Sequence, residues 1–150
     1  MKKVLSVFLV GMLIVGFFSL AMAASDADQA KALVNKAKAY LKANGTDKTI
    51  AAANNKSGPF VKGELYVFIY DDKGTIIAHP MNPGLVGKYM LDIKDSDGRL
   101  FSRDFYTKAK AGGGWVDYRW TNPVTKVIEP KSSYVIWQDN MIIGCGIYKK

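Results

Sequence analysis

One histidine, His79, and one cysteine, Cys145, are the side chains of this sequence best suited to nucleophilic or metal chemistry. Structural zinc sites and multi-histidine centres need several such ligands, so one residue of each type excludes them. Cys145 lies in the apolar run Met141 to Ile147, without a nearby cation to lower its pKa. We therefore expect a small buried hydrophobic residue there, no catalytic residues, no metal and no other cofactor.

Two motifs match known binding loops only in part. Asp95-Ser96-Asp97-Gly98 begins like a calcium-binding loop, but the EF-hand spacing requires a glutamate where the chain has Tyr106. We interpret it as a plain turn. The three glycines at 112–114 lack the Lys-Ser/Thr pair of a phosphate-binding loop and precede an expected strand.

The elements that position these residues follow from the hydrophobic periodicity. Apolar residues recur at three- and four-residue steps from Asp26 to Asn44, which predicts a long N-terminal helix that ends before Gly45. A second helix is predicted from Asp47 to about Asn55, with Thr46 or Asp47 as its N-cap.

From Glu64 onward the pattern is that of strands. Both faces of Glu64 to Tyr70 are apolar or aromatic, which predicts a central strand, and Thr75 to His79 follows as its hairpin partner. A helix and three more strands are then predicted at Leu100 to Ala111, Trp115 to Trp120, about Lys131 to Trp137, and Met141 to Tyr148. The fold class is α+β, an antiparallel sheet of about five strands with a long N-terminal helix.

The first 23 residues are typical of a signal peptide. Lys2 and Lys3 precede an uncharged apolar run at residues 4–20, and Ala21-Met22-Ala23 has the form of a cleavage site. We expect a signal peptide at 1–23, one domain over 24–150, and a periplasmic or secreted protein. The alternative is an uncleaved inner-membrane anchor through residues 4–20, which is short for a membrane span.

The charge is positive, with 21 Lys and Arg against 13 Asp and Glu. The lysines are scattered without a dense run, and exported proteins rarely meet DNA. We interpret the charge as a solvated cationic surface and expect no nucleic-acid partner.

Six segments, taken in order, resemble the single Cache domain, type 2. They are 63–71, Ala78-His79-Pro80 with Asn82-Pro83 and Gly87, 95–98, 114–120, 130–135 and 144–148. The resemblance implies a PAS-like antiparallel sheet that binds small molecules outside the cell membrane, with small organic acids among the ligands. Such domains commonly form the sensory part of chemoreceptors and histidine kinases.

The chain ends two residues after the last expected strand, without the signalling segments of those receptors. We therefore expect a free-standing sensory module in signal transduction, with a membrane receptor or kinase as a possible partner. A small secreted enzyme or a structural interaction protein is the alternative. An enzyme should bring titratable groups together in a cleft, whereas a binding module should show an aromatic cavity with one charged anchor.

A small carboxylate needs a cation or several donors in an apolar enclosure. Lys131 matches a recurrent lysine of the family and is the expected anchor, assisted by His79. The expected walls, with polar tips, are Tyr66, Trp115, Tyr118, Trp120 and Tyr134.

Strand parity tests this set. Tyr118 and Trp120 share parity and should face the same side. Lys131 and Tyr134 do not, so both can enter one pocket only if the strand begins after Lys131 or contains a bulge. Arg103 and Arg119 are the alternative anchors, because a guanidinium can donate two parallel hydrogen bonds to one carboxylate.

Overall fold

The computed structural model describes residues 24–149. The signal peptide predicted over residues 1–23 lies outside these residues. Helix α1 spans Asp26–Asn44, as predicted, and its N-cap Ser25 accepts a hydrogen bond from the Asp28 amide. Helix α2 spans Thr46–Asn54. Its N-cap is Gly45, so the prediction of Thr46 or Asp47 as the cap is wrong. Gly45 has a positive φ of 81°, which glycine adopts without strain, and this single residue ends α1 and begins α2.

A six-stranded antiparallel sheet forms the centre of the molecule. The strands are β1 Val61–Lys62, β2 Leu65–Tyr70, β3 Ile76–Ala78, β4 Gly114–Thr121, β5 Ile128–Gln138 and β6 Met141–Tyr148. The order is β1-β2-β6-β5-β4, and β3 also pairs with β2. The α+β class and the central place of β2 are confirmed. The two-residue β1, too short to carry a periodic pattern, is the strand that the sequence did not reveal.

The turn between β5 and β6 fixes their register. Asp139 and Asn140 both have positive φ, 50° and 59°, in the two-residue loop between Gln138 and Met141. Two such residues in succession are the mark of a type I′ hairpin turn. Pairing then runs unbroken from Gln138 with Met141 to Lys131 with Tyr148, so each residue of β5 has a fixed face.

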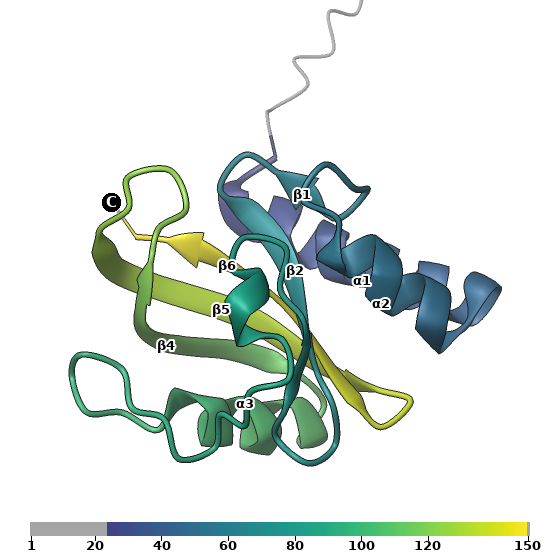
Figure 1. Cartoon of the computed structure of the whole chain (residues 1–150). Helices are drawn as coiled ribbons and strands as arrows, with labels where there is room; N and C mark the ends of the chain where they lie inside the picture. Colours follow the sequence, from purple (N-terminus) through teal and green to yellow (C-terminus); the bar gives the residue numbers. More distant parts are fainter. Residues whose placement is uncertain (1–23, 150) are drawn as a thin grey trace, which may run out of the picture.

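Two layers cover the sheet (Figure 1). Helix α1 packs on β2, β5 and β6, and α2 lies beside it over β2 and β3. Helix α3, Phe101–Lys110, covers the other face near β4 and β5, and the short η1, Pro83–Leu85, lies in the long connection before it. Each face has its own apolar core.

Strand β2 contributes to both cores because all six of its residues are buried. Leu65, Val67 and Ile69 face α1, whereas Tyr66, Phe68 and Tyr70 face the side that α3 covers. The period-two alternation of a strand explains this division. The second face is the one that carries the candidate site.

Candidate functional site

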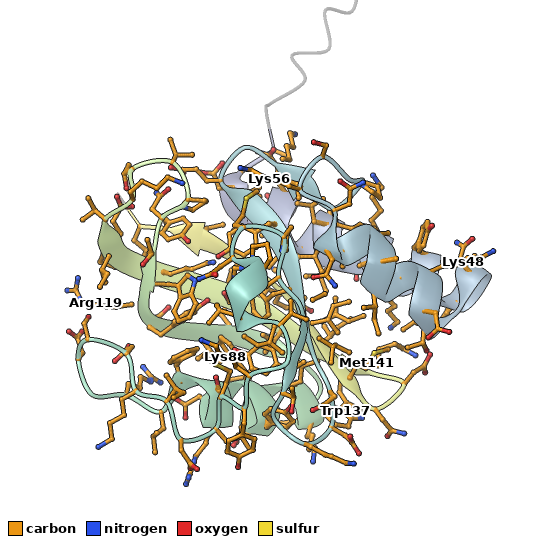
Figure 2. The ribbon with its side chains drawn as sticks, viewed as in Figure 1. Lys48, Lys56, Lys88, Arg119, Trp137 and Met141 are labelled. Carbon is orange, nitrogen blue, oxygen red and sulfur yellow. The ribbon has the colours of Figure 1, made fainter. Side chains whose placement is uncertain are left out.

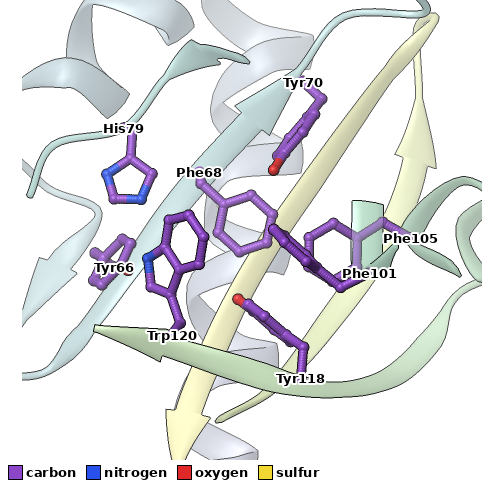
Figure 3. Close-up of a pocket in the computed structure, with 8 residues that line it drawn as sticks. All are labelled: Tyr66, Phe68, Tyr70, His79, Phe101, Phe105, Tyr118 and Trp120. Carbon is purple, nitrogen blue, oxygen red and sulfur yellow. The ribbon is translucent and has the colours of Figure 1, made fainter. Parts of the chain in front are cut away.

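An aromatic cavity lies between the sheet and α3 (Figure 3). It has a volume of about 210 Å³, and the side chains around it leave room for about one water molecule. The lining residues come from β2, β4, α3 and the segment after β3: Tyr66, Phe68, Tyr70, His79, Phe101, Phe105, Tyr118 and Trp120. A ligand held here is small and surrounded by rings, an environment in which each polar contact is strengthened by the exclusion of water.

Two hydroxyl pairs lie in the walls of the cavity. The Tyr118 and Ser133 hydroxyls are 2.9 Å apart, and those of Tyr70 and Ser102 are 3.3 Å apart. Burial raises the pKa of Tyr118 well above its ordinary value, and it raises that of Tyr70 as well. Both phenols therefore stay protonated near neutral pH and can donate hydrogen bonds.

Lys131 is buried beside this cavity, with 1% of its surface exposed. Its Nζ donates to the Tyr66 hydroxyl at 2.8 Å and lies 4.1 and 4.8 Å from the ring centres of Tyr66 and Tyr148. None of the ion pairs within residues 24–149 involves it. Burial lowers the pKa of Lys131 to about 7. Among the described residues its ammonium group therefore has no anionic partner, and its contact with the cavity is through Tyr66.

His79 presents one nitrogen to its own loop and one to the cavity. Its Nδ1 accepts the Asn82 amide at 3.0 Å, and its backbone amide donates to Asn54. Burial, and then the charge of Lys131, lowers the pKa of His79 to about 3. The neutral ring therefore carries its proton on Nε2, which makes His79 a hydrogen-bond donor for an anion.

Two glycines of β6 make the room that this arrangement needs. A Cβ at Gly146 would lie 2.3 Å from Lys131 Cε and 2.4 Å from Ser133 Oγ. A Cβ at Gly144 would lie 2.4 Å from Phe68 Cζ. The Lys131 side chain thus passes over β6 at Gly146, where the strand has no side chain, and reaches Tyr66 on β2. These glycines were not among the predicted site residues, although glycines that alternate within a strand indicate a close approach of another group to the backbone.

We expect Gly146→Ala to weaken ligand binding roughly tenfold or more, which corresponds to about 1.4 kcal/mol. The new methyl group displaces Lys131 from Tyr66, and the overpacking costs about 1–3 kcal/mol of stability. Titration calorimetry and a denaturant melt measure the two effects. Gly84→Ala is the control, because the nearest atom to its Cβ is 3.4 Å away. Unchanged binding by the Gly146 variant contradicts the expectation that Lys131 anchors the ligand.

The structure brings five of the seven predicted residues together. Tyr66, His79, Tyr118 and Trp120 line the cavity, and Lys131 lies directly behind Tyr66. The shared orientation of Tyr118 and Trp120 is confirmed. Four lining residues were not predicted as site residues: Phe68, Tyr70, Phe101 and Phe105. The alternation within β2 was a signal for Phe68 and Tyr70, since they share the face of Tyr66.

Trp115 and Tyr134 lie elsewhere, so their predicted place in this pocket is corrected. Both pack on the α1 side of the sheet, where Lys31 Nζ lies 6.0 and 5.7 Å from their ring centres. Strand β5 includes Lys131 and pairs with β6 without a bulge. Tyr134 and its cross-strand partner Trp115 therefore point to the opposite face from Lys131.

The two alternative anchors are on the surface. Arg103 pairs with Asp92 at 2.6 Å and Arg119 with Asp97 at 2.9 Å. Figure 2 shows Arg119 at the edge of the molecule, with its side chain directed outward. Neither guanidinium lines the aromatic cavity.

A second, wider hollow adjoins the cavity. This outer opening has a volume of about 540 Å³ and shares Tyr66, His79 and Trp120 with the cavity. Its remaining walls come from the loop after His79 and from the β4–β5 hairpin: Met81, Asn82, Thr121, Asn122, Pro123 and Lys126. The three shared side chains therefore stand between the cavity and solvent.

Comparison with known proteins adds an independent observation. The family model described as Single Cache domain 2 matches residues 23–150. The chain belongs to this family. The family is a sensory, ligand-binding one and not a catalytic one, and its domains are extracytoplasmic.

Solved Cache structures agree with the fold. A methyl-accepting chemotaxis protein from Vibrio parahaemolyticus RIMD 2210633 is 26% identical, with a TM-score of 0.70 over 81% of this chain and 87% of that chain. A periplasmic sensor domain of a chemotaxis protein is 28% identical, with a TM-score of 0.64 over 81% and 89%. A third structure, of a Cache chemosensory domain that recognises carboxylic acids, is 26% identical, with a TM-score of 0.64 over 81% and 87%.

A curated relative is the sensor histidine kinase MctS of Rhizobium johnstonii (strain DSM 114642 / LMG 32736 / 3841). The two are 38% identical over 85 residues, which make up 55% of this chain and 18% of the kinase. This chain therefore matches only a small part of that protein. No helix of residues 24–149 is long and apolar enough to span a membrane.

Proposed function

We propose that this Cache protein is an extracytoplasmic receptor module for a small carboxylic acid. In this proposal the carboxylate receives hydrogen bonds from Lys131, Tyr66 and His79, and the rest of the ligand lies among the rings of the aromatic cavity. The observation that carries the proposal is the buried Lys131 ammonium, whose hydrogen-bond partner within residues 24–149 is the neutral Tyr66 hydroxyl. A buried cation without a counter-ion is expensive, and an anionic ligand offsets that cost.

Two further observations support a carboxylate. His79 offers a neutral N–H donor beside Tyr66, since their ring centres are 5.0 Å apart. Carboxylic acid recognition is also the subject of the related Cache structure. A charge-assisted contact in an aromatic enclosure is the type of recognition that a small acid needs.

We further propose that the protein acts in the periplasm or outside the cell and reports ligand occupancy to a membrane receptor or kinase. The sequence of residues 1–23 supports export, and the similarity to sensory domains of chemoreceptors and kinases supports signalling. Binding rather than catalysis is favoured because Cys145 lies in the core on the α1 side of the sheet, whereas His79 lines the cavity on the other side. Burial also raises the pKa of Cys145 to about 12.

A thermal-shift screen of the purified exported protein tests this function. At 100 times its dissociation constant a ligand contributes about 2.7 kcal/mol, which raises the melting temperature by roughly 5–10 °C. We expect such shifts with acids of two to four carbons. The primary amide of each acid is the matched control, because it keeps the shape and loses the charge. Equal shifts with acid and amide, or shifts with amines alone, contradict the proposal.

A further inference from the structure

The Tyr118–Ser133 hydroxyl pair has more hydrogen-bonding capacity than the structure uses. The two groups carry two protons, and a single hydrogen bond of 2.9 Å joins them. Within residues 24–149 neither hydroxyl has another hydrogen-bond partner. Tyr118 lines the cavity, and both residues are buried. One proton of the pair is therefore free for an oxygen atom of a ligand.

This pair lies beside the proposed carboxylate anchor. Tyr118 is the direct cross-strand partner of Lys131 in the β4–β5 ladder, and Ser133 is two residues from Lys131 on the same face of β5. Lys131 Cε and Ser133 Oγ both crowd the point where a Gly146 side chain would begin, at 2.3 and 2.4 Å. A molecule of two or three carbons can therefore contact both groups.

The second hydroxyl pair of the cavity is not a neighbour of Lys131 in the sheet. Tyr70 is four residues from Tyr66 on β2, a separation of about 13 Å along the backbone of a strand. Its partner Ser102 belongs to α3. The Tyr118–Ser133 pair, by contrast, includes the direct cross-strand partner of Lys131.

We propose that the Tyr118–Ser133 pair recognises an oxygen atom on the carbon next to the carboxylate, so that the preferred ligand is a short 2-hydroxy or 2-oxo acid. This inference rests on the proposed function and names the class of acid. A simple acid leaves the free hydroxyl proton in a dry cavity without an acceptor, whereas a 2-oxygen accepts it. Sites built to hydrogen-bond an oxygen discriminate strongly against analogues that lack it. We expect a preference of about 10- to 100-fold.

Titration calorimetry with lactate and propionate tests the inference, because the two acids share a carbon skeleton and differ by one hydroxyl. Pyruvate against propionate, and glycolate against acetate, repeat the comparison. The parent protein should bind each oxygenated acid at least tenfold more tightly than its partner. Tyr118→Phe should reduce this ratio to about one.

Tyr70→Phe is the matched control, since it removes another buried phenol hydroxyl from the same cavity. It should keep the preference for lactate. Ser133→Ala is the second test variant, and it keeps the inference testable if Tyr118→Phe does not fold by circular dichroism. It leaves the single proton of Tyr118, which lines the cavity, without another partner. The preference for lactate should therefore be kept or increased, and its loss in Ser133→Ala contradicts the inference.

The outcomes separate the two proposals. Equal binding of lactate and propionate by the parent overturns the 2-oxygen inference and leaves the carboxylate receptor intact. Binding of neither acid, nor of any other small carboxylate, contradicts the proposed function itself. If Tyr118→Phe keeps the parent's preference, or if Ser133→Ala loses it, the Tyr118–Ser133 pair does not bind the 2-oxygen and the inference is wrong.

Discussion

Lys131→Met should weaken carboxylate binding by at least about 30-fold and make the unliganded protein more stable. The substitution keeps the length of the side chain and removes the proposed anchor. Truncating one partner of a buried, hydrogen-bonded charge pair costs about 2–5 kcal/mol, or roughly 30- to 5,000-fold in affinity. Calorimetric titration with the best acid from the thermal screen measures this loss.

The gain in stability has a separate cause. Below pH 7 the parent holds a buried ammonium between two tyrosine rings, without an anionic partner among residues 24–149. Replacing buried charged groups with apolar side chains of similar size stabilises proteins by about 1–4 kcal/mol. We expect a gain in this range in denaturant melts at pH 6. The gain should shrink toward pH 10, because the parent itself becomes more stable as the folded state loses the Lys131 proton above pH 7.

Lys48→Met is the matched control, since Lys48 is exposed on α2, far from the cavity (Figure 2). It should leave affinity and stability close to those of the parent. If Lys131→Met binds the acid within twofold of the parent, Lys131 is not the anchor. A variant that is strongly destabilised at pH 6 contradicts the assignment of a costly buried cation.

Carboxylate affinity should fall as the pH rises from 7 to 9, by about tenfold for each pH unit. The free folded protein has a Lys131 pKa of about 7, and only the protonated form attracts the anion. Small carboxylic acids are fully ionised in this range. Binding above pH 7 therefore takes up a proton. Calorimetry at pH 8 in two buffers of different ionisation enthalpy measures this uptake directly, and affinities at pH 6, 7, 8 and 9 give the slope.

The slope belongs to Lys131 because its neighbours titrate elsewhere. Burial keeps the pKa of Tyr66 and Tyr118 well above 10, raises those of Tyr148 and Cys145 to about 12, and lowers that of His79 to about 3. Glu64 and Glu129 are the acidic residues that act on Tyr148. Residual binding of Lys131→Met should not change with pH. An affinity of the parent that stays constant from pH 6 to 9 contradicts a buried lysine that ionises near neutrality.

The sequence by itself determined the elements of the fold. Helix α1 and strand β6 have the bounds that periodicity predicted, and the other predicted elements differ by a few residues at their ends. These patterns are local, since one buried face imposes a period of 3.6 on a helix and of two on a strand. The six ordered segments were enough to indicate the family. The helix cap at Gly45 was missed because it depends on the φ of a single residue, and strand β1 was missed because two residues are too few to show a period.

Only the tertiary structure decided which candidates share one cavity. The strand parity of Lys131 and Tyr134 predicts that they point to opposite faces if one regular strand includes both. Only the structure shows that β5 begins before Lys131 and pairs with β6 without a bulge. The same holds for Lys131 itself, whose side chain reaches Tyr66 because Gly146 of the intervening strand has no side chain. Such a contact joins residues 65 positions apart, and no local pattern encodes it. Local periodicity fixes the face of each residue, whereas strand order and the space left by β6 fix which faces meet and what fits between them.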